Sequence, residues 1–213
     1  MTVIALTSVP PRFAGLGPVL ESLLAQGAAK VVLALPRRYL RFPGAVSPPP
    51  LPGGVDLLRC EDHGPATKFL AAQSAEPGAA IAICDDDCLY APGWLAALED
   101  AAEHGAAAGS VFSVERLKRR GGLVAQGFAG VLVPAGFTCP PPPEVCLAAD
   151  DLWLSAHLAL AGVEISECSS ARAAVAPFSA PEPLQDRKRA ETYAKAAADI
   201  HDRLGIWPPT YGE

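Results

Sequence analysis

Residues 79–90 read AAIAICDDDCLY, an apolar run that ends in the three consecutive carboxylates Asp85, Asp86 and Asp87. An Ala-Ile-Ala-Ile run bounded by polar residues is typical of a buried strand. Three like charges within a few ångströms repel one another unless their pKa values rise or a cation binds beside them. A hard divalent ion with oxygen ligands is the simplest such cation, so this stretch predicts a metal-dependent enzyme.

The chain has 213 residues, 50% of them apolar, which is enough to bury a core in one large domain or two small ones. Its net charge of −6 disfavours nucleic acid as the main partner. The six cysteines form neither a disulfide framework nor a zinc-binding pattern. Neither a long apolar run nor a leader pattern occurs, so we expect a soluble, cytoplasmic protein with reduced thiols, for which peripheral membrane contact is open.

Strand and helix patterns alternate through the first half of the chain. We expect strands at Thr2–Leu6, Lys30–Leu35, Val55–Cys60 and Ala79–Cys84, and helices over 15–26, from about Ala66, and over 93–104 with Pro92 at the first turn. This alternation predicts an α/β fold with a mostly parallel sheet flanked by helices on both faces. Ligands of such sheets gather beyond the carboxyl ends of the strands, where the 7–12 loop, the 62–68 turn and the acidic triplet lie.

The second half has a different character. The pattern predicts strands over 109–114 and 127–133, a rigid proline-rich connector over 139–143, an amphipathic helix over 148–161, one or two short strands within 163–176 and a charged helix over 184–204. The Trp207-Pro208-Pro209 tail is expected to pack across the domain. The basic cluster 116–120 is either a solvated turn or a phosphate-facing loop.

Two acidic groups stand out as candidate sites. Because side chains alternate along an extended chain, Asp85 and Asp87 point to the same side and Asp86 points elsewhere. A solvated acidic turn is the alternative interpretation, which the buried strand before the triplet and Tyr90 after it weaken. Asp150 and Asp151 fall in the first turn of a predicted helix, where simple capping of the helix is the alternative to catalysis.

These motifs and their order resemble the GT-A glycosyltransferases, and among them a family 2-like bacterial branch. The resemblance rests on TSVPPRF (7–13), GPATK (64–68), the DDD motif after its apolar strand, GFAGV (127–131) and ADDLW (149–153), over roughly residues 2–165. It implies a single GT-A-like domain over 1–213. Residues 1–105 would form a Rossmann-like nucleotide-sugar and metal-binding half, and residues 106–213 a smaller acceptor half with the C-terminal helix.

The resemblance also implies roles for individual residues. Asp87 would bind Mn²⁺ or Mg²⁺ directly, and Asp85 would contact the metal or the ribose. Asp151 would be the general base of an inverting reaction, with Asp150 in support. The residues expected to border the nucleotide-sugar are Thr7, Arg12, Lys68, Asp85 and Asp86.

The sequence leaves the roles of several basic and histidine side chains open. Lys68 and Arg12 are either near the phosphates or solvated surface cations. Whether His201 or Arg172 reaches the metal or the phosphates is open, and His157 and His63 are weaker candidates.

The implied activity is the metal-dependent transfer of a sugar from a UDP- or GDP-sugar to a hydroxyl acceptor in the synthesis of a glycan or cell-surface polysaccharide. The acceptor would be a glycan, a lipid-linked sugar or another hydroxyl compound. Two alternatives come from other classes. A phosphohydrolase of the haloacid dehalogenase kind also carries Asp-x-Asp after an apolar strand, and a non-catalytic nucleotide- or glycan-binding module would keep the fold without turnover.

Overall fold

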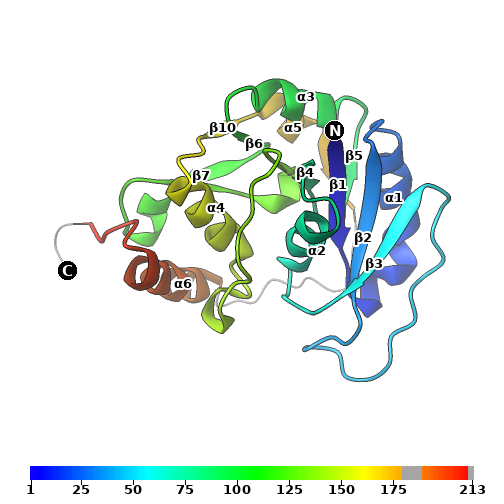
Figure 1. Cartoon of the computed structure of the whole chain (residues 1–213), viewed down its shortest axis with the longest axis horizontal. Coiled ribbons are helices and arrows are strands. Elements are labelled where there is room, and N and C mark those ends of the chain that lie inside the picture. Colours follow the sequence, from blue (N-terminus) through cyan, green and yellow to red (C-terminus); the bar gives the residue numbers. More distant parts are fainter. Residues whose placement is uncertain (179–188, 211–213) are drawn as a thin grey trace.

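The computed structural model describes residues 1–178 and 189–210 and shows an α/β fold built on a mostly parallel sheet (Figure 1). The central sheet has seven strands in the order β10-β6-β9-β4-β1-β2-β3. Only β9 runs against its neighbours, because it pairs antiparallel with both β4 and β6, whereas the other pairs are parallel. The strands of the first half thus form one continuous sheet with strands of the second half.

The strands are β1 Thr2–Thr7, β2 Lys30–Pro36, β3 Val55–Cys60, β4 Ala80–Ile83, β5 Cys88–Tyr90, β6 Ala106–Ala108, β7 Val111–Ser113, β8 Leu123–Ala125, β9 Val131–Val133, β10 Ile165–Glu167 and β11 Val175–Pro177. The helices are α1 Leu16–Leu24, α2 Thr67–Ala75, α3 Trp94–Ala101, α4 Asp150–Leu160, α5 Ser169–Ala173 and α6 Arg189–Leu204. Two small antiparallel pairs, β5 with β11 and β7 with β8, stand beside the central sheet.

Helices cover both faces of the sheet (Figure 1). Ile81 and Ile83 of β4 belong to the core that α2, α4 and α6 complete. Ala82 between them belongs to the opposite core, which α1, α3 and α5 complete. The alternating side chains of one short strand therefore anchor both layers, as a strand buried on both faces requires.

The expected strands and helices of the first half are confirmed, but Pro92 is not in a first helical turn. Gly93 precedes α3 in the left-handed conformation at φ 88°, so the proline lies outside the helix. Two strands of the second half are shorter than predicted. The strand expected over 109–114 is reduced to β7, because Gly109 lies between β6 and β7. The strand expected over 127–133 is reduced to β9, because residues Gly127–Ala129 form a 3₁₀ helix before it.

The C-terminal region agrees with the sequence pattern where the structure describes it. Residues 184–188 of the predicted last helix lie outside the described residues, and α6 begins at Arg189. The short helix α5 was not predicted. Trp207 is buried, and the backbone of the following prolines accepts hydrogen bonds from Arg120, so the basic cluster 116–120 is a turn held against the tail. No helix in the described part of the chain is long and apolar enough to cross a membrane.

Candidate functional site

The acidic triplet lies at the carboxyl end of β4, and its three side chains have different surroundings. Asp86 is buried, where one carboxylate oxygen accepts a hydrogen bond from Ser8 Oγ at 2.5 Å and the other pairs with Arg12 Nη1 at 2.6 Å. Asp85 and Asp87 keep 35% and 32% of their side chains exposed. The predicted alternation is not observed, because Asp86 and Asp87 lie in a turn and share Arg12, whereas Asp85 pairs with Lys68.

Two protein cations sit beside these carboxylates. Lys68 Nζ lies 2.5 Å from Asp85 Oδ1, and Arg12 Nη1 lies 3.1 Å from Asp87 Oδ2 as well as bonding Asp86. Burial raises the pKa of Asp87, and its two acidic neighbours raise it further against the opposing effect of Arg12. The chain itself thus supplies part of the positive charge that the sequence argument assigned to a metal ion.

Lys68 is the buried centre of a larger charge cluster. Lys68 is only 3% exposed, so it is not a solvated surface lysine. Burial alone would lower its pKa, but the nearby carboxylates of Asp85, Asp150 and Asp151 raise it above the ordinary value. The turn before α2 places it there, because Gly64 adopts φ 59° and a Cβ on that glycine would lie 3.0 Å from the Leu147 carbonyl oxygen.

Asp150 and Asp151 begin α4 and face the same lysine. Burial raises the pKa of Asp151 to about 7, helped by repulsion from Asp150 and opposed by Lys68. Burial likewise raises the pKa of Asp150. The Asp151 carboxylate accepts a hydrogen bond from the Gly127 amide at 3.0 Å, so its orientation is fixed by the 3₁₀ turn before β9. These contacts exceed what simple capping of the helix requires.

Glycines let this turn come close to the charged groups. A Cβ on Gly127 would lie 3.2 Å from Lys68 Nζ and 3.3 Å from Asp151 Oδ1. Gly130 closes the turn at φ 90°, and a Cβ there would lie 2.3 Å from the Trp94 ring. Because β9 is antiparallel to β4, its first residue pairs with Ile83, and the turn comes to the end of β4 where the triplet begins.

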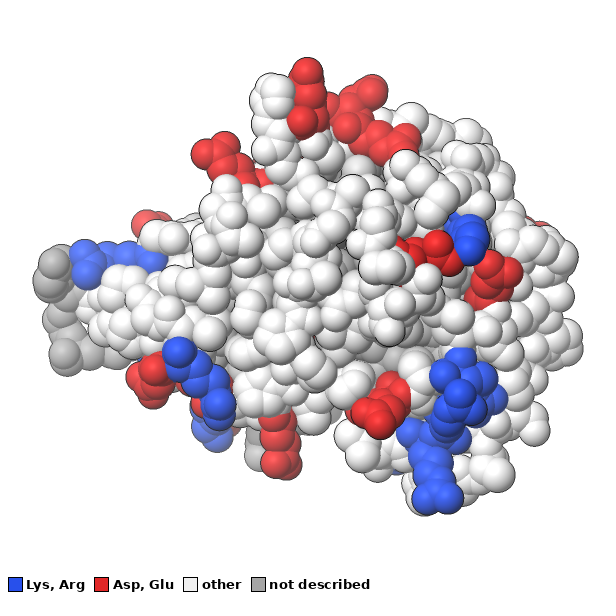
Figure 2. All heavy atoms as spheres, viewed as in Figure 1, with Lys and Arg blue, Asp and Glu red and all other residues white. Residues whose placement is uncertain are grey.

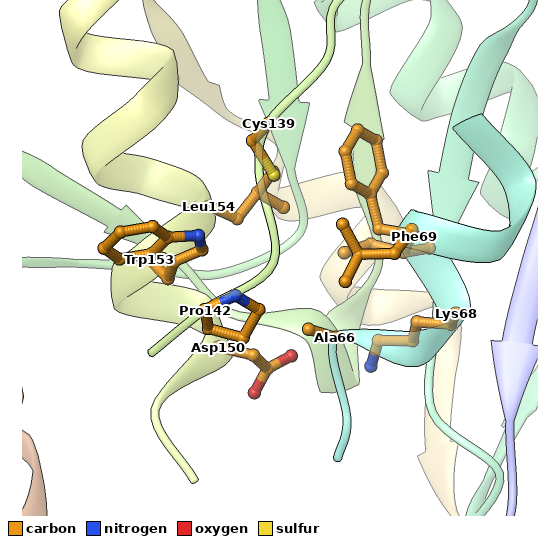
Figure 3. Close-up of a pocket in the computed structure, with 10 residues that line it drawn as sticks. Ala66, Lys68, Phe69, Cys139, Pro142, Asp150, Trp153 and Leu154 are labelled. Atoms are coloured by element: carbon orange, nitrogen blue, oxygen red, sulfur yellow. The ribbon is translucent and has the colours of Figure 1, made fainter. Parts of the chain in front are cut away.

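A small pocket opens beside the cluster, and Figure 3 shows Lys68 and Asp150 at the same end of it. Phe69, Trp153 and Leu154 are among the apolar side chains that line the rest. The space holds about one water molecule, which is far less than a sugar needs. This pocket is therefore too small for a sugar, and the partly exposed Asp85 and Asp87 are not among the residues that line it.

The first residues of α6 add a cation that the sequence did not reveal. Arg189 donates a hydrogen bond to the Tyr193 hydroxyl at 3.1 Å and stacks over its ring. Burial would lower the pKa of Arg189, but the Tyr193 hydroxyl and the carboxylates of Asp151 and Asp85 raise it. No local motif marks Arg189, since its nearness to these groups depends on how the last helix packs.

Other predicted residues take structural positions. The Thr7 hydroxyl donates to the Ala34 carbonyl at 2.7 Å and so joins β1 to β2. His201 Nδ1 lies 2.8 Å from the Ile206 carbonyl oxygen, past the end of α6. Arg172 stacks over Phe128 and donates to the Val175 carbonyl. His157 packs against the Trp153 ring, and His63 lies 3.9 Å from Glu61.

The carboxylates of the site suit a divalent ion only if a substrate supplies the other ligands. Across residues 1–178 and 189–210, no group of three or more His, Cys, Asp or Glu side chains is arranged to hold a metal ion. Asp85 and Asp87 are nevertheless two partly exposed carboxylates that follow the same strand. One or two carboxylates together with substrate phosphates are the usual ligands of Mg²⁺, so the residues suit a metal that arrives with a nucleotide.

No protein-family model matches the chain, and no curated protein matches it. Among solved structures, it is similar to 2-C-methyl-D-erythritol 4-phosphate cytidylyltransferase from Thermus thermophilus. The two share 18% identity over 92% of this chain and 97% of that chain, with a TM-score of 0.42. A TM-score of that size carries no conclusion about activity.

Proposed function

We propose that the chain is a nucleotide-binding transferase, and specifically a glycosyltransferase that moves a sugar from a nucleotide-sugar to a hydroxyl acceptor. One observation carries the proposal. Two partly exposed carboxylates, Asp85 and Asp87, follow a strand of a mostly parallel sheet, and Asp85 pairs with a buried lysine that also influences Asp151, whose burial raises its pKa to about 7. Metal-bound diphosphate and a proton acceptor are the two things that such a transfer needs.

The donor would bind along the open edge. Asp87, with Asp85 beside it, would hold Mn²⁺ or Mg²⁺ together with the phosphates, and the ion would stabilise the charge that develops on the leaving diphosphate. Asp86 does not face the donor in this arrangement. It fixes Arg12 and Ser8 through buried hydrogen bonds, and so it holds the loop after β1 beside the edge.

The acceptor would meet Asp151. A general base works best when its pKa lies near the operating pH, and burial places the pKa of Asp151 at about 7. The Gly127 amide orients the carboxylate, and Lys68 stabilises its ionised form after burial has disfavoured it. Asp150 shares the lysine and helps to keep it charged. The carboxylate would take the proton from the acceptor hydroxyl as that oxygen attacks the anomeric carbon.

The test is a screen of nucleotide-sugars for Mn²⁺-dependent hydrolysis, followed by the variants Asp87→Asn and Asp151→Asn. Asp87→Asn should lose metal-dependent nucleotide binding. Asp151→Asn should keep donor binding and lose turnover by about two to four orders of magnitude, the usual contribution of a positioned base. The matched control is Asp202→Asn, on the exposed side of α6, which should change neither. Near-normal turnover of Asp151→Asn would show that another group takes the proton.

A further inference from the structure

A group of arginines follows β2, on a segment that we name the arginine loop (residues 37–42). Arg37, Arg38 and Arg41 are exposed, although the whole chain carries a net charge of −6. Figure 2 shows Lys and Arg side chains gathered at the lower right of the molecule, below β3 in the view of Figure 1. Leu40 stands among the arginines with 75% of its surface exposed, the highest value of any large hydrophobic residue in the described part of the chain.

The shape of the arginine loop is fixed by hydrogen bonds. The buried Tyr39 donates its hydroxyl proton to the Ser8 carbonyl at 2.9 Å. The Leu40 amide donates to Asp62 at 2.7 Å, and the Arg37 amide donates to the Cys60 carbonyl at 2.9 Å. A loop held at three points presents its exposed side chains in one arrangement, so Leu40 and the arginines face solvent together.

The arginine loop also adjoins the candidate site. Ser8, whose carbonyl anchors Tyr39, is the residue whose hydroxyl bonds Asp86. Both segments lie at the carboxyl ends of neighbouring strands, because β1 and β2 are paired and parallel. Whatever binds the arginine loop is therefore held beside the carboxylates of the triplet.

We propose that the arginine loop docks on an anionic phospholipid surface. Arginines are attracted to the negative headgroups, and an apolar residue between them can enter the boundary with the acyl chains. Leu40, with the half-buried Phe42 behind Arg41, provides that apolar contact. A soluble phosphate compound would use the arginines but would leave Leu40 without a role. Resting on the proposed function, this docking makes the acceptor a lipid-linked one.

The experiment is sedimentation of the full chain with vesicles of phosphatidylcholine, with and without phosphatidylglycerol. Each arginine near such a surface strengthens binding about fivefold, so Arg37→Gln with Arg38→Gln should weaken binding to the anionic vesicles about thirtyfold. The matched control, Arg116→Gln with Lys195→Gln, changes the net charge equally at exposed positions outside the arginine loop and should bind as the wild type does. Leu40→Ser should also weaken binding.

Three results would overturn the proposal. The first is equal retention of the wild type by neutral and anionic vesicles, and the second is a loss in the control pair as large as that in the arginine loop pair. The third is saturable binding of inorganic phosphate that depends on Arg37 and Arg38 without any retention by vesicles. Nucleotide binding measured on the same samples separates the two proposals, since a protein that binds vesicles but no nucleotide contradicts only the glycosyltransferase assignment.

Discussion

Replacing Asp151 by asparagine should make the protein more stable at alkaline pH while removing its proposed base. Burial raises the pKa of Asp151 from 3.8 to about 7, which means that the folded state holds its proton more tightly than the unfolded state does. The shift is about three pKa units at 1.36 kcal/mol each, so the ionised carboxylate costs the fold about 4 kcal/mol above both pKa values.

The sign of the pH dependence follows from the direction of this shift. Because the folded pKa is raised, the free energy of unfolding contributed by Asp151 is highest below 3.8 and falls as the pH rises toward about 7. Asparagine keeps an oxygen for the Gly127 amide but carries no charge. The variant should therefore match the wild type near pH 4 and gain on it by about 3 kcal/mol between about pH 5 and pH 8.

The assay is urea unfolding of the wild type and of Asp151→Asn at about pH 5 and at about pH 8, with the free energies of unfolding extrapolated to water. Asp202→Asn on the exposed side of α6 is the control for removing a carboxylate, and it should show the pH dependence of the wild type. The reasoning is refuted if Asp151→Asn is less stable than the wild type at pH 8, or if the two proteins lose stability in parallel as the pH rises.

Three further substitutions test the packing of the site. Lys68→Met should lower the free energy of unfolding by about 3–5 kcal/mol in urea at neutral pH, because it leaves the partly buried carboxylates around it without their cation, and no loss would mean that the lysine does not balance them. Gly130→Ala should destabilise by more than Gly136→Ala in the same assay: both glycines have positive φ, but only at Gly130 would the Cβ lie 2.3 Å from Trp94. Gly127→Ala should reduce the rate of nucleotide-sugar turnover by a larger factor than it reduces the equilibrium constant of folding, because its Cβ would displace the ends of Lys68 and Asp151. Unchanged turnover would show that this turn is not part of the proposed site.

The sheet could be predicted from the sequence because its strands are continuous apolar runs with clear ends. β1, β2, β3 and β4 begin or end within one residue of their predicted limits. The segment after Gly127 was predicted as one strand because its residues are small and apolar. The structure divides it, since Gly130 adopts φ 90° and the preceding residues form a 3₁₀ turn that bonds Asp151.

The gathering of the loops after β1 and β3 and the acidic triplet at one edge could be predicted from the alternation of strands and helices, but the burial of their side chains could not. The sequence leaves open whether Lys68 is solvated, and only tertiary packing buries it among Asp85 after β4 and the two carboxylates of α4. Arg189 could not be found, because no short motif brings the start of α6 near Asp151. The assignment of residues 1–105 to the donor and 106–213 to the acceptor stays a prediction.

The most direct test is calorimetric binding of UDP and GDP to the wild type with Mn²⁺ and with a chelator, repeated on Asp87→Asn. We expect one of the nucleotides to bind only when Mn²⁺ is present, and we expect that binding to disappear in the variant while its thermal unfolding stays that of a folded protein. Binding of neither nucleotide, or equal binding with the chelator, would contradict a metal-bridged diphosphate at Asp85 and Asp87.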